Sequence, residues 1–364
     1  MEEKLLATLR SGNDITSPLV PIVYEYAAFV VLKDLPVGSE FGIDYMSWKT
    51  GDRFLGIKMI PPGFHFVFVS VKEPQELGFV HSFTSREVLI YKWDCKEETL
   101  IRDRNSKEMD ESAAEATRMG MKNIDSNLAP YPYEHYRKFF SLTDFVRKED
   151  AERVAPLCGL ITSQQELESL ETKMEREADV GCSSSVNKQN PRRMRFADSE
   201  GLPVMEVKPG QELRFTPVPQ LPGDLGRDYL DYSNHLEGLI RQIGEHVVLA
   251  EMQLAFVIFL IGQVWEGLEQ WKKWVHVVCF SPSSLRTRPS FFLSLLRVLF
   301  FAVRECPRDF FVDIVSKDYF LTTTLSILFA NIQEGDNISE ELRKKSRAFK
   351  AFLVKNYSWD FEIE

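Results

Sequence analysis

The stretch from Gly38 to Phe66 constrains the fold more than any other part of the chain. It contains five glycines, the pair Pro61-Pro62 and the tryptophan Trp48. Glycine permits backbone conformations that a side chain forbids, while proline fixes φ and removes a hydrogen-bond donor. The stretch therefore specifies a detailed geometry of strands and loops, without any plausible catalytic cluster. We expect a shaped recognition surface here.

The pattern around this stretch is typical of β-structure. Short runs of β-branched and aromatic residues, broken by glycine and proline, recur between Ala27 and Trp93. In the run from Phe64 to Val71, phenylalanines occupy one face of the strand and valines occupy the other. A strand that is apolar on both faces belongs inside a sandwich or in a sheet backed by helices.

Helical patterns dominate the second half of the chain. Apolar residues from Trp265 to Val278 recur at steps of three or four, the stripe of an amphipathic helix. Two apolar stretches, Val247 to Ile261 and Phe291 to Val303, contain the charged residues Glu251 and Arg297. Both are shorter than the roughly 20 residues of a membrane span. We therefore expect two buried core helices and no membrane segment.

Together these patterns predict an α+β protein with two domains. A β-rich, sandwich-like domain is expected over residues 20–147, with a helix near its end that docks onto the strands. Residues 148–200 are rich in polar and small side chains without a sustained period, so we interpret them as a flexible linker. A C-terminal α-helical domain follows over residues 201–358, and residues 359–364 form a tail.

Composition and charge argue against several classes of function. The 54 acidic residues outnumber the 44 basic ones, and a net charge of −10 argues against binding nucleic acid or anionic membranes through overall charge. The five cysteines have no CxxC spacing, so they indicate neither a zinc site nor a disulfide framework. The N-terminus lacks the basic region and apolar core of a secretory signal. We expect an intracellular protein in a reducing compartment.

Catalytic motifs are absent from the sequence. It contains no GxSxG, GxxxxGK[ST], GxGxxG or HExxH pattern. His65 lies in an apolar strand and is expected to be a satisfied core histidine. Asp309, Asp313 and Asp318 are conceivable cation ligands, but their apolar neighbours favour a short helix that they cap and solvate. We predict no catalytic residue, metal site or cofactor.

Two basic segments have open alternatives. Lys188 to Arg195 is interpreted as a solvated part of the linker, with a nuclear-import or phosphate-contacting patch as the alternative. Basic residues between Arg343 and Lys350 lie on one face of a predicted helix. We interpret this face as solvated, with contact to an acidic partner as the alternative.

Six segments together resemble the eukaryotic cistron-splicing factor family, the assembly chaperones of the U5 snRNP. They occur in the family's order between Ala27 and Phe361, and IDY, SW and IPPG in one strand region are the most specific part. The segments are GSEFGIDYMSW, GIKMIPPGFHF, PYPYEHYRKFFSLTDF, EMQLAFVIFLIGQVWEGLEQWKKW, DFFVDIVSKDYFLTTTL and FKAFLVKNYSWDF.

The resemblance implies a non-enzymatic splicing factor whose C-terminal all-α domain is VHS-like. Such a chaperone binds the RNase-H-like and Jab/MPN-like domains of the largest U5 snRNP scaffold protein. It thereby delays binding of the U5 RNA helicase and of RNA. We expect a monomer before complex formation, in cytoplasm and nucleus, without direct contact to nucleic acid. A generic scaffold of another intracellular assembly pathway is the alternative.

A grip on a partner protein requires aromatic and arginine anchors near the centre of the interface. For Tyr45, Trp48 and Tyr133, a place in the core is the alternative. The tail WDFEIE has no evident core of its own and could add an edge strand to a partner sheet, although family members often have a longer tail. The candidate anchors are Tyr45, Trp48, Arg53, Tyr131, Tyr133, Trp359 and Phe361.

Overall fold

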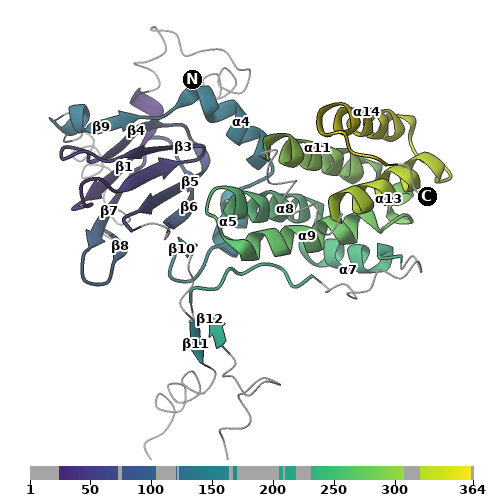
Figure 1. The fold of residues 1–364 in the computed structure, drawn as a ribbon, viewed down its shortest axis with the longest axis horizontal. Helices are drawn as coiled ribbons and strands as arrows, with labels where there is room; N and C mark the ends of the chain where they lie inside the picture. Colours follow the sequence, from purple (N-terminus) through teal and green to yellow (C-terminus); the bar gives the residue numbers. More distant parts are fainter. Residues whose placement is uncertain are drawn as a thin grey trace, which may run out of the picture.

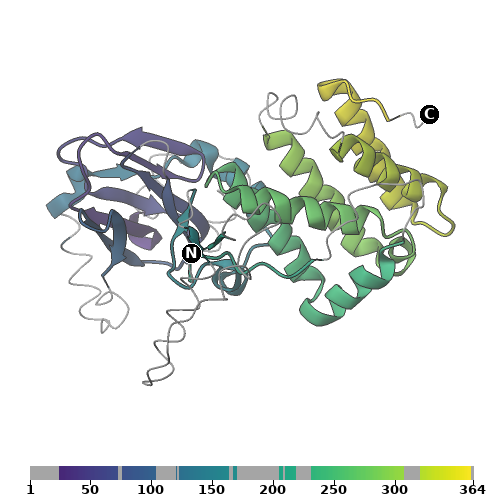
Figure 2. The ribbon, with the colours of Figure 1, turned by 60° about the horizontal axis from the view of Figure 1, so that its bottom comes forward.

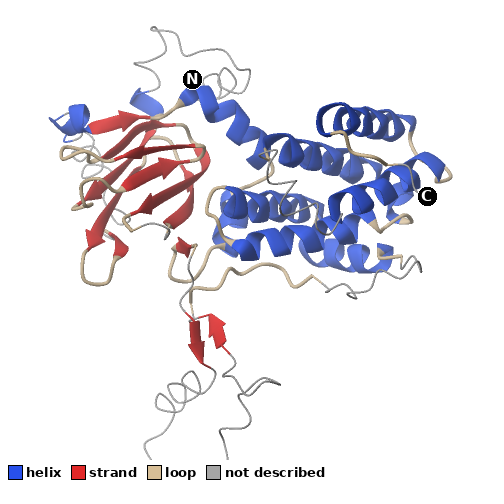
Figure 3. Ribbon diagram, in the orientation of Figure 1, coloured by secondary structure: helices blue, strands red, loops and turns tan. Residues whose placement is uncertain are grey.

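The computed structural model of the protein describes residues 24–72, 76–103, 120, 123–163, 167–169, 205–207, 210–218, 231–306 and 320–361. Strands gather in the N-terminal part and helices in the C-terminal part (Figures 1 and 3). The predicted α+β layout, with a β-rich domain before an all-α domain, is confirmed. Likeness of the helical part to VHS domains stays a prediction.

Two five-stranded sheets form the N-terminal domain, in the strand orders β8-β7-β1-β4-β9 and β10-β6-β5-β2-β3. The first sheet is mixed, because β1 runs parallel to β7 and antiparallel to β4. Strand pairs in the second sheet are antiparallel. The strands are β1 (Ala28–Lys33), β2 (Glu40–Ile43), β3 (Met46–Lys49), β4 (Gly56–Ile60), β5 (Gly63–Ser70), β6 (Leu77–Phe83), β7 (Val88–Asp94), β8 (Thr99–Arg102), β9 (Leu128–Pro130) and β10 (Ile161–Thr162).

The second sheet is covered on both faces. Val67 and Val69 of β5 face the first sheet and pack with residues such as Leu32 in the core of the sandwich. Phe66 and Phe68, on the opposite face of the same strand, belong to the core that contains the helices. Both arrangements that the sequence allowed for this strand therefore occur at once.

The helices of the C-terminal domain pack around α8, which is apolar on nearly every side. Their bounds are α7 (Ser233–Ile243), α8 (Glu245–Leu260), α9 (Trp265–Cys279), α10 (Ser284–Thr287), α11 (Pro289–Glu305), α13 (Phe320–Glu334) and α14 (Glu340–Tyr357). Helix α8 contacts α7, α9 and α11. Gly267 of α9 permits the close approach, since a Cβ there would lie 2.6 Å from the Ala255 carbonyl oxygen. The buried core helix predicted over Val247 to Ile261 is confirmed.

No single described helix is long and apolar enough to cross a membrane. Among the described residues, only α7 and α8 together reach that length and hydropathy, as a pair bent by 98°.

Two short helices connect the domains (Figure 2). Helix α4 (Tyr133–Thr143) contacts α8 and α11, while α5 (Lys148–Val154) contacts β5, β6 and α8. The prediction of a flexible linker over residues 148–200 is therefore wrong for residues 148–154, which form α5. Helix α5 is too short to show a clear period, yet it buries Ala151 and Val154. Residues 170–200 lie outside the described ranges. Strand β11 (Leu167–Ser169) precedes them in the chain, β12 (Met205–Val207) follows them, and the two strands pair antiparallel.

Candidate functional site

Asp44 fixes the turn between β2 and β3 in the glycine-rich stretch. Its φ of 53° lies in the left-handed region, which aspartate tolerates better than most residues. Its backbone N–H donates to the Phe66 carbonyl (2.8 Å), and its Oδ1 accepts from the Phe66 N–H (3.0 Å). Its Oδ2 accepts from the Tyr131 hydroxyl (2.6 Å) and lies 2.7 Å from His65 Nδ1. The buried carboxylate thus joins three segments of the β-rich domain.

His65 is a satisfied core histidine, as the sequence predicted. Its side chain is buried, and its Nε2 lies 2.9 Å from the Pro61 carbonyl oxygen while Nδ1 faces Asp44. A carbonyl oxygen only accepts hydrogen bonds, so Nε2 carries a hydrogen. Both ring nitrogens are engaged, and neither is available to a metal ion or a substrate.

Tyr131 and Tyr133, two of the predicted anchors, fasten the start of α4 to the sandwich. Tyr131 is buried, and burial together with the Asp44 carboxylate raises the pKa of its phenol well above the ordinary value. Tyr133 is half-buried, and its hydroxyl donates to the Met59 carbonyl. Tyr133 therefore takes the core alternative, and the buried Tyr131 ring lies away from the surface. Contact of either residue with a partner stays a prediction.

Tyr45 lies where the β2–β3 turn meets the helices. Its ring packs edge-on against Phe139 of α4, and Lys138 Nζ lies 4.3 Å from the ring centroid. Lys138 also lies 3.1 Å from Glu305 at the end of α11. Burial raises the pKa of the Tyr45 phenol far above its ordinary value, and Glu305 raises it further. Tyr45 thus helps to join the two domains.

Trp48 and Arg53 are the predicted anchors of this stretch that reach the surface. Trp48 lies on β3, the edge strand of the second sheet, and stacks on Phe41 with ring centroids 6.4 Å apart. Its ring is partly exposed, between the exposed residues Ser47 and Lys49. Arg53 is exposed in the loop before β4. Contact of either residue with a partner stays a prediction.

The end of the chain folds back onto the helical domain. Phe361 is buried edge-on against Phe329 of α13, with ring centroids 5.3 Å apart. Trp359 packs against Tyr357 and Phe361. The expectation that the tail has no core to join is therefore wrong for residues 359–361. They pack on the helical domain because burying a phenylalanine stabilises the folded chain more than leaving it exposed. Residues 362–364 lie outside the described ranges.

Glu251 forms a second buried carboxylate centre, inside apolar α8. Its Oε1 accepts hydrogen bonds of 3.0 Å each from the Thr216 N–H, Gln270 Nε2 and Trp274 Nε1. Its Oε2 accepts from the Thr216 hydroxyl (2.7 Å) and forms an ion pair with Arg153 Nη2 at 2.7 Å. The carboxylate thereby connects α5, α8, α9 and residues 210–218.

Contacts across the domain junction are both apolar and polar. Phe66 of β5 packs so closely on Gly262 that a Cβ there would lie 2.7 Å from the phenyl ring. The Gln253 amide of α8 accepts from the Phe145 N–H and donates to Asp144 Oδ1, both at 2.8 Å. These contacts make the two domains one interlocked body.

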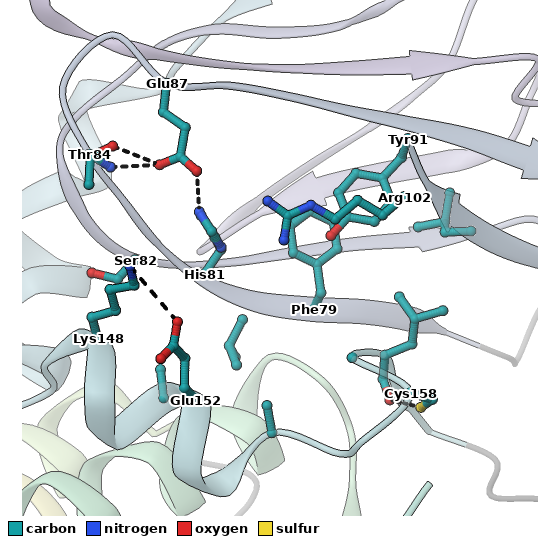
Figure 4. Close-up of a pocket in the computed structure, with 16 residues that line it drawn as sticks. Phe79, His81, Ser82, Thr84, Glu87, Tyr91, Arg102, Lys148, Glu152 and Cys158 are labelled. Atoms are coloured by element: carbon teal, nitrogen blue, oxygen red, sulfur yellow. Dashed lines mark hydrogen bonds and ion pairs between the residues drawn. The ribbon is translucent and has the colours of Figure 1, made fainter. Parts of the chain in front are cut away.

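A pocket of about 510 Å³ opens between β6, β7, β8 and α5 (Figure 4). Glu87 accepts from His81 Nε2 (2.8 Å) and from the Thr84 N–H (2.8 Å). Burial alone would raise the pKa of Glu87, but these hydrogen bonds hold it below the ordinary value. Glu152 enters from α5, on the opposite side of the pocket in Figure 4. The carboxylates therefore do not converge as a general acid and base would.

Metal binding finds no support in the described part of the chain. It contains no group of three or more His, Cys, Asp or Glu residues that could hold a metal ion. Asp309, Asp313 and Asp318, and the basic segment 188–195, lie outside the described residues.

Family models match both halves of the chain. The model of the AAR2 N-terminal domain matches residues 26–156, and the model of the AAR2 C-terminal repeat region matches residues 211–362. The chain belongs to the AAR2 family. This confirms the resemblance seen in the sequence, which identified a family of U5 snRNP assembly factors.

Three AAR2 relatives show how far the similarity extends. The chain is 45% identical to Protein AAR2 homolog of Caenorhabditis elegans over 97% of this chain and 100% of the relative. It is 33% identical to the Mus musculus homolog, covering 97% and 95% of the two chains. It is 34% identical to the Homo sapiens homolog, covering 93% and 91%. The similarity therefore includes both domains of the AAR2 fold.

Sequence reasoning missed how the buried charges of this AAR2 chain are used. The sequence analysis identified Glu251 only as a charged residue in an apolar stretch, and Asp44 only as part of the IDY motif. It predicted the hydrogen-bond partners of neither carboxylate. A charged residue inside an apolar stretch signals a buried, paired group. The pocket side chains Arg102 and Lys148 gave no comparable signal, because both have charged residues as neighbours in the sequence, as surface residues commonly do.

Proposed function

We propose that this chain is a non-enzymatic assembly chaperone for the largest U5 snRNP scaffold protein. It binds the scaffold's RNase-H-like and Jab/MPN-like domains and sterically delays binding of the U5 RNA helicase and of RNA. Membership of the AAR2 family supports a role in splicing and U5 snRNP assembly in general. The specific partner domains and the competition are the content of this proposal.

The observation that carries the proposal is the interlocked junction beside an exposed edge. Phe66, Gly262 and Gln253 hold the domains together, so both present their surfaces in a fixed relation. A binder with a fixed shape loses less conformational entropy on association than a flexible one. Trp48 on the β3 edge and Arg53 in the loop between β3 and β4 have the chemistry of interface anchors.

The remaining parts of the proposal concern state and location. The chaperone is a monomer before complex formation, works in cytoplasm and nucleus, and does not contact nucleic acid directly. A generic scaffold of another intracellular assembly pathway is the competing function, and binding data decide between them.

The test is a quantitative binding experiment with the purified full chain. The scaffold's RNase-H-like domain, its Jab/MPN-like domain and the two joined together are titrated separately. The proposal predicts binding to the joined domains that is tighter than to either alone, because two linked contacts raise the effective concentration. Failure to bind any of the three would defeat it.

Trp48→Ala tests the anchor role of the β3 edge. We expect a loss of affinity for the joined domains of about 2 kcal/mol, typical of a hot-spot tryptophan. Isothermal titration calorimetry measures the affinity, and urea denaturation verifies the fold.

Trp265→Ala is the matched control, since Trp265 on α9 is 53% exposed and distant in sequence from β3. It is expected to leave the affinity unchanged. If Trp48→Ala retains both stability and affinity, Trp48 is neither an anchor nor a core residue.

A further inference from the structure

The pocket of Figure 4 lies at an open edge of the sandwich, where strands of both sheets meet α5. Apolar side chains such as Phe79, Leu100 and Leu160 line part of its wall. Its volume, about 510 Å³, is in the range of pockets that bind small groups in proteins. Polar and charged side chains enter from the remaining sides, and one of them is incompletely paired.

Arg102, the last residue of β8, is the side chain that is incompletely paired among the described residues. Figure 4 shows it extending past Phe79 and Tyr91 toward His81. Its Nε is buried and makes no hydrogen bond within the described structure. A buried guanidinium nitrogen without a partner costs free energy, since it has given up water without replacing it.

The acidic side chains of the pocket are already engaged elsewhere. Glu87 accepts from His81 and Thr84. Glu152 lies 4.0 Å from Lys148 Nζ, one turn away on α5. Neither carboxylate forms an ion pair with Arg102 among the described contacts. Among the described residues, the pocket therefore contains a guanidinium that no carboxylate pairs with.

We propose that this pocket binds an oxyanion carried on a side chain of a protein partner, either a phosphate ester or a carboxylate. Arg102 supplies the planar donor fork that suits both groups, and Lys148 supplies a second positive charge at the rim. The apolar wall receives the methylene groups that carry the anion. The inference goes beyond the proposed function because it does not depend on which protein supplies the anion.

The experiment uses the full chain labelled with ¹⁵N-arginine and observed by NMR. The probes are N-acetyl-O-phosphoserine and N-acetylglutamate at equal ionic strength, with N-acetylserine as the neutral probe. The Arg102 Nε–H signal, assigned by its loss in Arg102→Gln, is expected to shift saturably with at least one of the acids. The acid that binds identifies the anion as phosphate or carboxylate.

Variants separate a specific site from general attraction to positive charge. Arg102→Gln is expected to weaken binding about tenfold, the usual effect of losing a charge-assisted hydrogen bond. Arg102→Lys is expected to weaken it less, because the charge stays while the fork is lost. Lys148→Gln, at a half-exposed position, is expected to weaken binding severalfold without affecting the fold. Arg241→Gln, at an exposed position of α7, is the control.

Two results would overturn the proposal. One is the absence of a saturable shift with either acid in the wild-type chain. The other is equal affinity in the wild type, Arg102→Gln and Lys148→Gln, monitored through the backbone amide signals of pocket residues in uniformly ¹⁵N-labelled chains. If Arg102→Gln fails to fold, Lys148→Gln and the wild-type titration still decide the outcome.

Discussion

Asp44 and Glu251 are both buried carboxylates, but they stabilise different levels of the structure. Asp44 joins residues of the β-rich domain, and its bonds to Phe66 and Tyr131 lie within that domain. Glu251 joins α8 to Arg153 of α5 and to Thr216, which lie on either side of residues 170–200. A buried carboxylate therefore fixes a turn within the β-rich domain at Asp44, and attaches the connecting segments to the helical domain at Glu251.

The difference shows which region depends on distant parts of the chain. If the Asp44 centre fails, the β-rich domain loses its turn geometry. If the Glu251 centre fails, α5 and residues 210–218 lose their attachment to α8. We expect the second failure to cost more, because five donors and cations around Glu251 would lose their acceptor together.

The largest effect is expected for Glu251→Ala. Removing one partner of a buried, charged network costs about 3–5 kcal/mol in the free energy of unfolding. Urea denaturation measures this loss, and Glu334→Ala at the exposed end of α13 is the control, with an expected change within about 0.5 kcal/mol. A loss below about 1 kcal/mol for Glu251→Ala would remove the distinction between the two centres.

Tyr131→Phe tests the Asp44 centre with a smaller expected effect. The substitution removes the hydroxyl that donates to Asp44 and keeps the ring, so we expect a loss of about 1.5–3 kcal/mol. The same loss should shrink above pH about 10, since the unfolded phenol ionises there while the folded one, with its raised pKa, keeps its proton.

Tyr26→Phe is the control for this variant, because the Tyr26 hydroxyl makes no hydrogen bond within the described residues. Denaturation at pH 8 and pH 10.5 gives both free energies. A loss that is constant across this range would show that Tyr131 ionises equally in both states.

The smallest effect is expected for His276 of α9, through the dependence of stability on pH below 7. Burial lowers the pKa of His276 to about 4, whereas the unfolded imidazole has its ordinary value near 6.5. Its contribution to stability is present above pH about 6.5 and is lost as pH falls toward 4. His276→Gln should therefore reduce the dependence of stability on pH between 7 and 5.

His235→Gln is the matched control, since His235 is exposed on α7. It is expected to leave that pH dependence unchanged, as measured by urea denaturation at several pH values. An unaltered dependence in His276→Gln would assign acid sensitivity to other groups.

The local pattern of residues predicted much of the fold. Alternation in Phe64 to Val71 and the all-apolar run in α8 depend only on neighbours in sequence, so they identified the strand and the helix correctly. Helix α5 was missed because seven residues hold too little of a helical period. The burial of Phe361 was missed because its neighbour Phe329 lies on another helix.

The exposure of the candidate anchors was harder to predict than the fold. Trp48 and Arg53 reach the surface, but Tyr131, Tyr133 and Phe361 turned inward. An aromatic residue in a loop has the same appearance in sequence whether it faces solvent or the core. Exposure depends on which element packs over it, and that element is distant along the chain.

The sequence by itself determined the order of strands and helices, the apolar faces of the main elements and the family. Only the tertiary structure decided that Asp44 binds His65 and Tyr131 and that Glu251 holds α5 to α8. It also placed Arg102 in a pocket where its buried Nε has no hydrogen-bond partner among the described residues. The physical reason is the separation along the sequence over which each kind of interaction acts. Backbone propensity and periodicity act between neighbours in the chain, whereas buried charges are satisfied by groups that folding brings together from far apart.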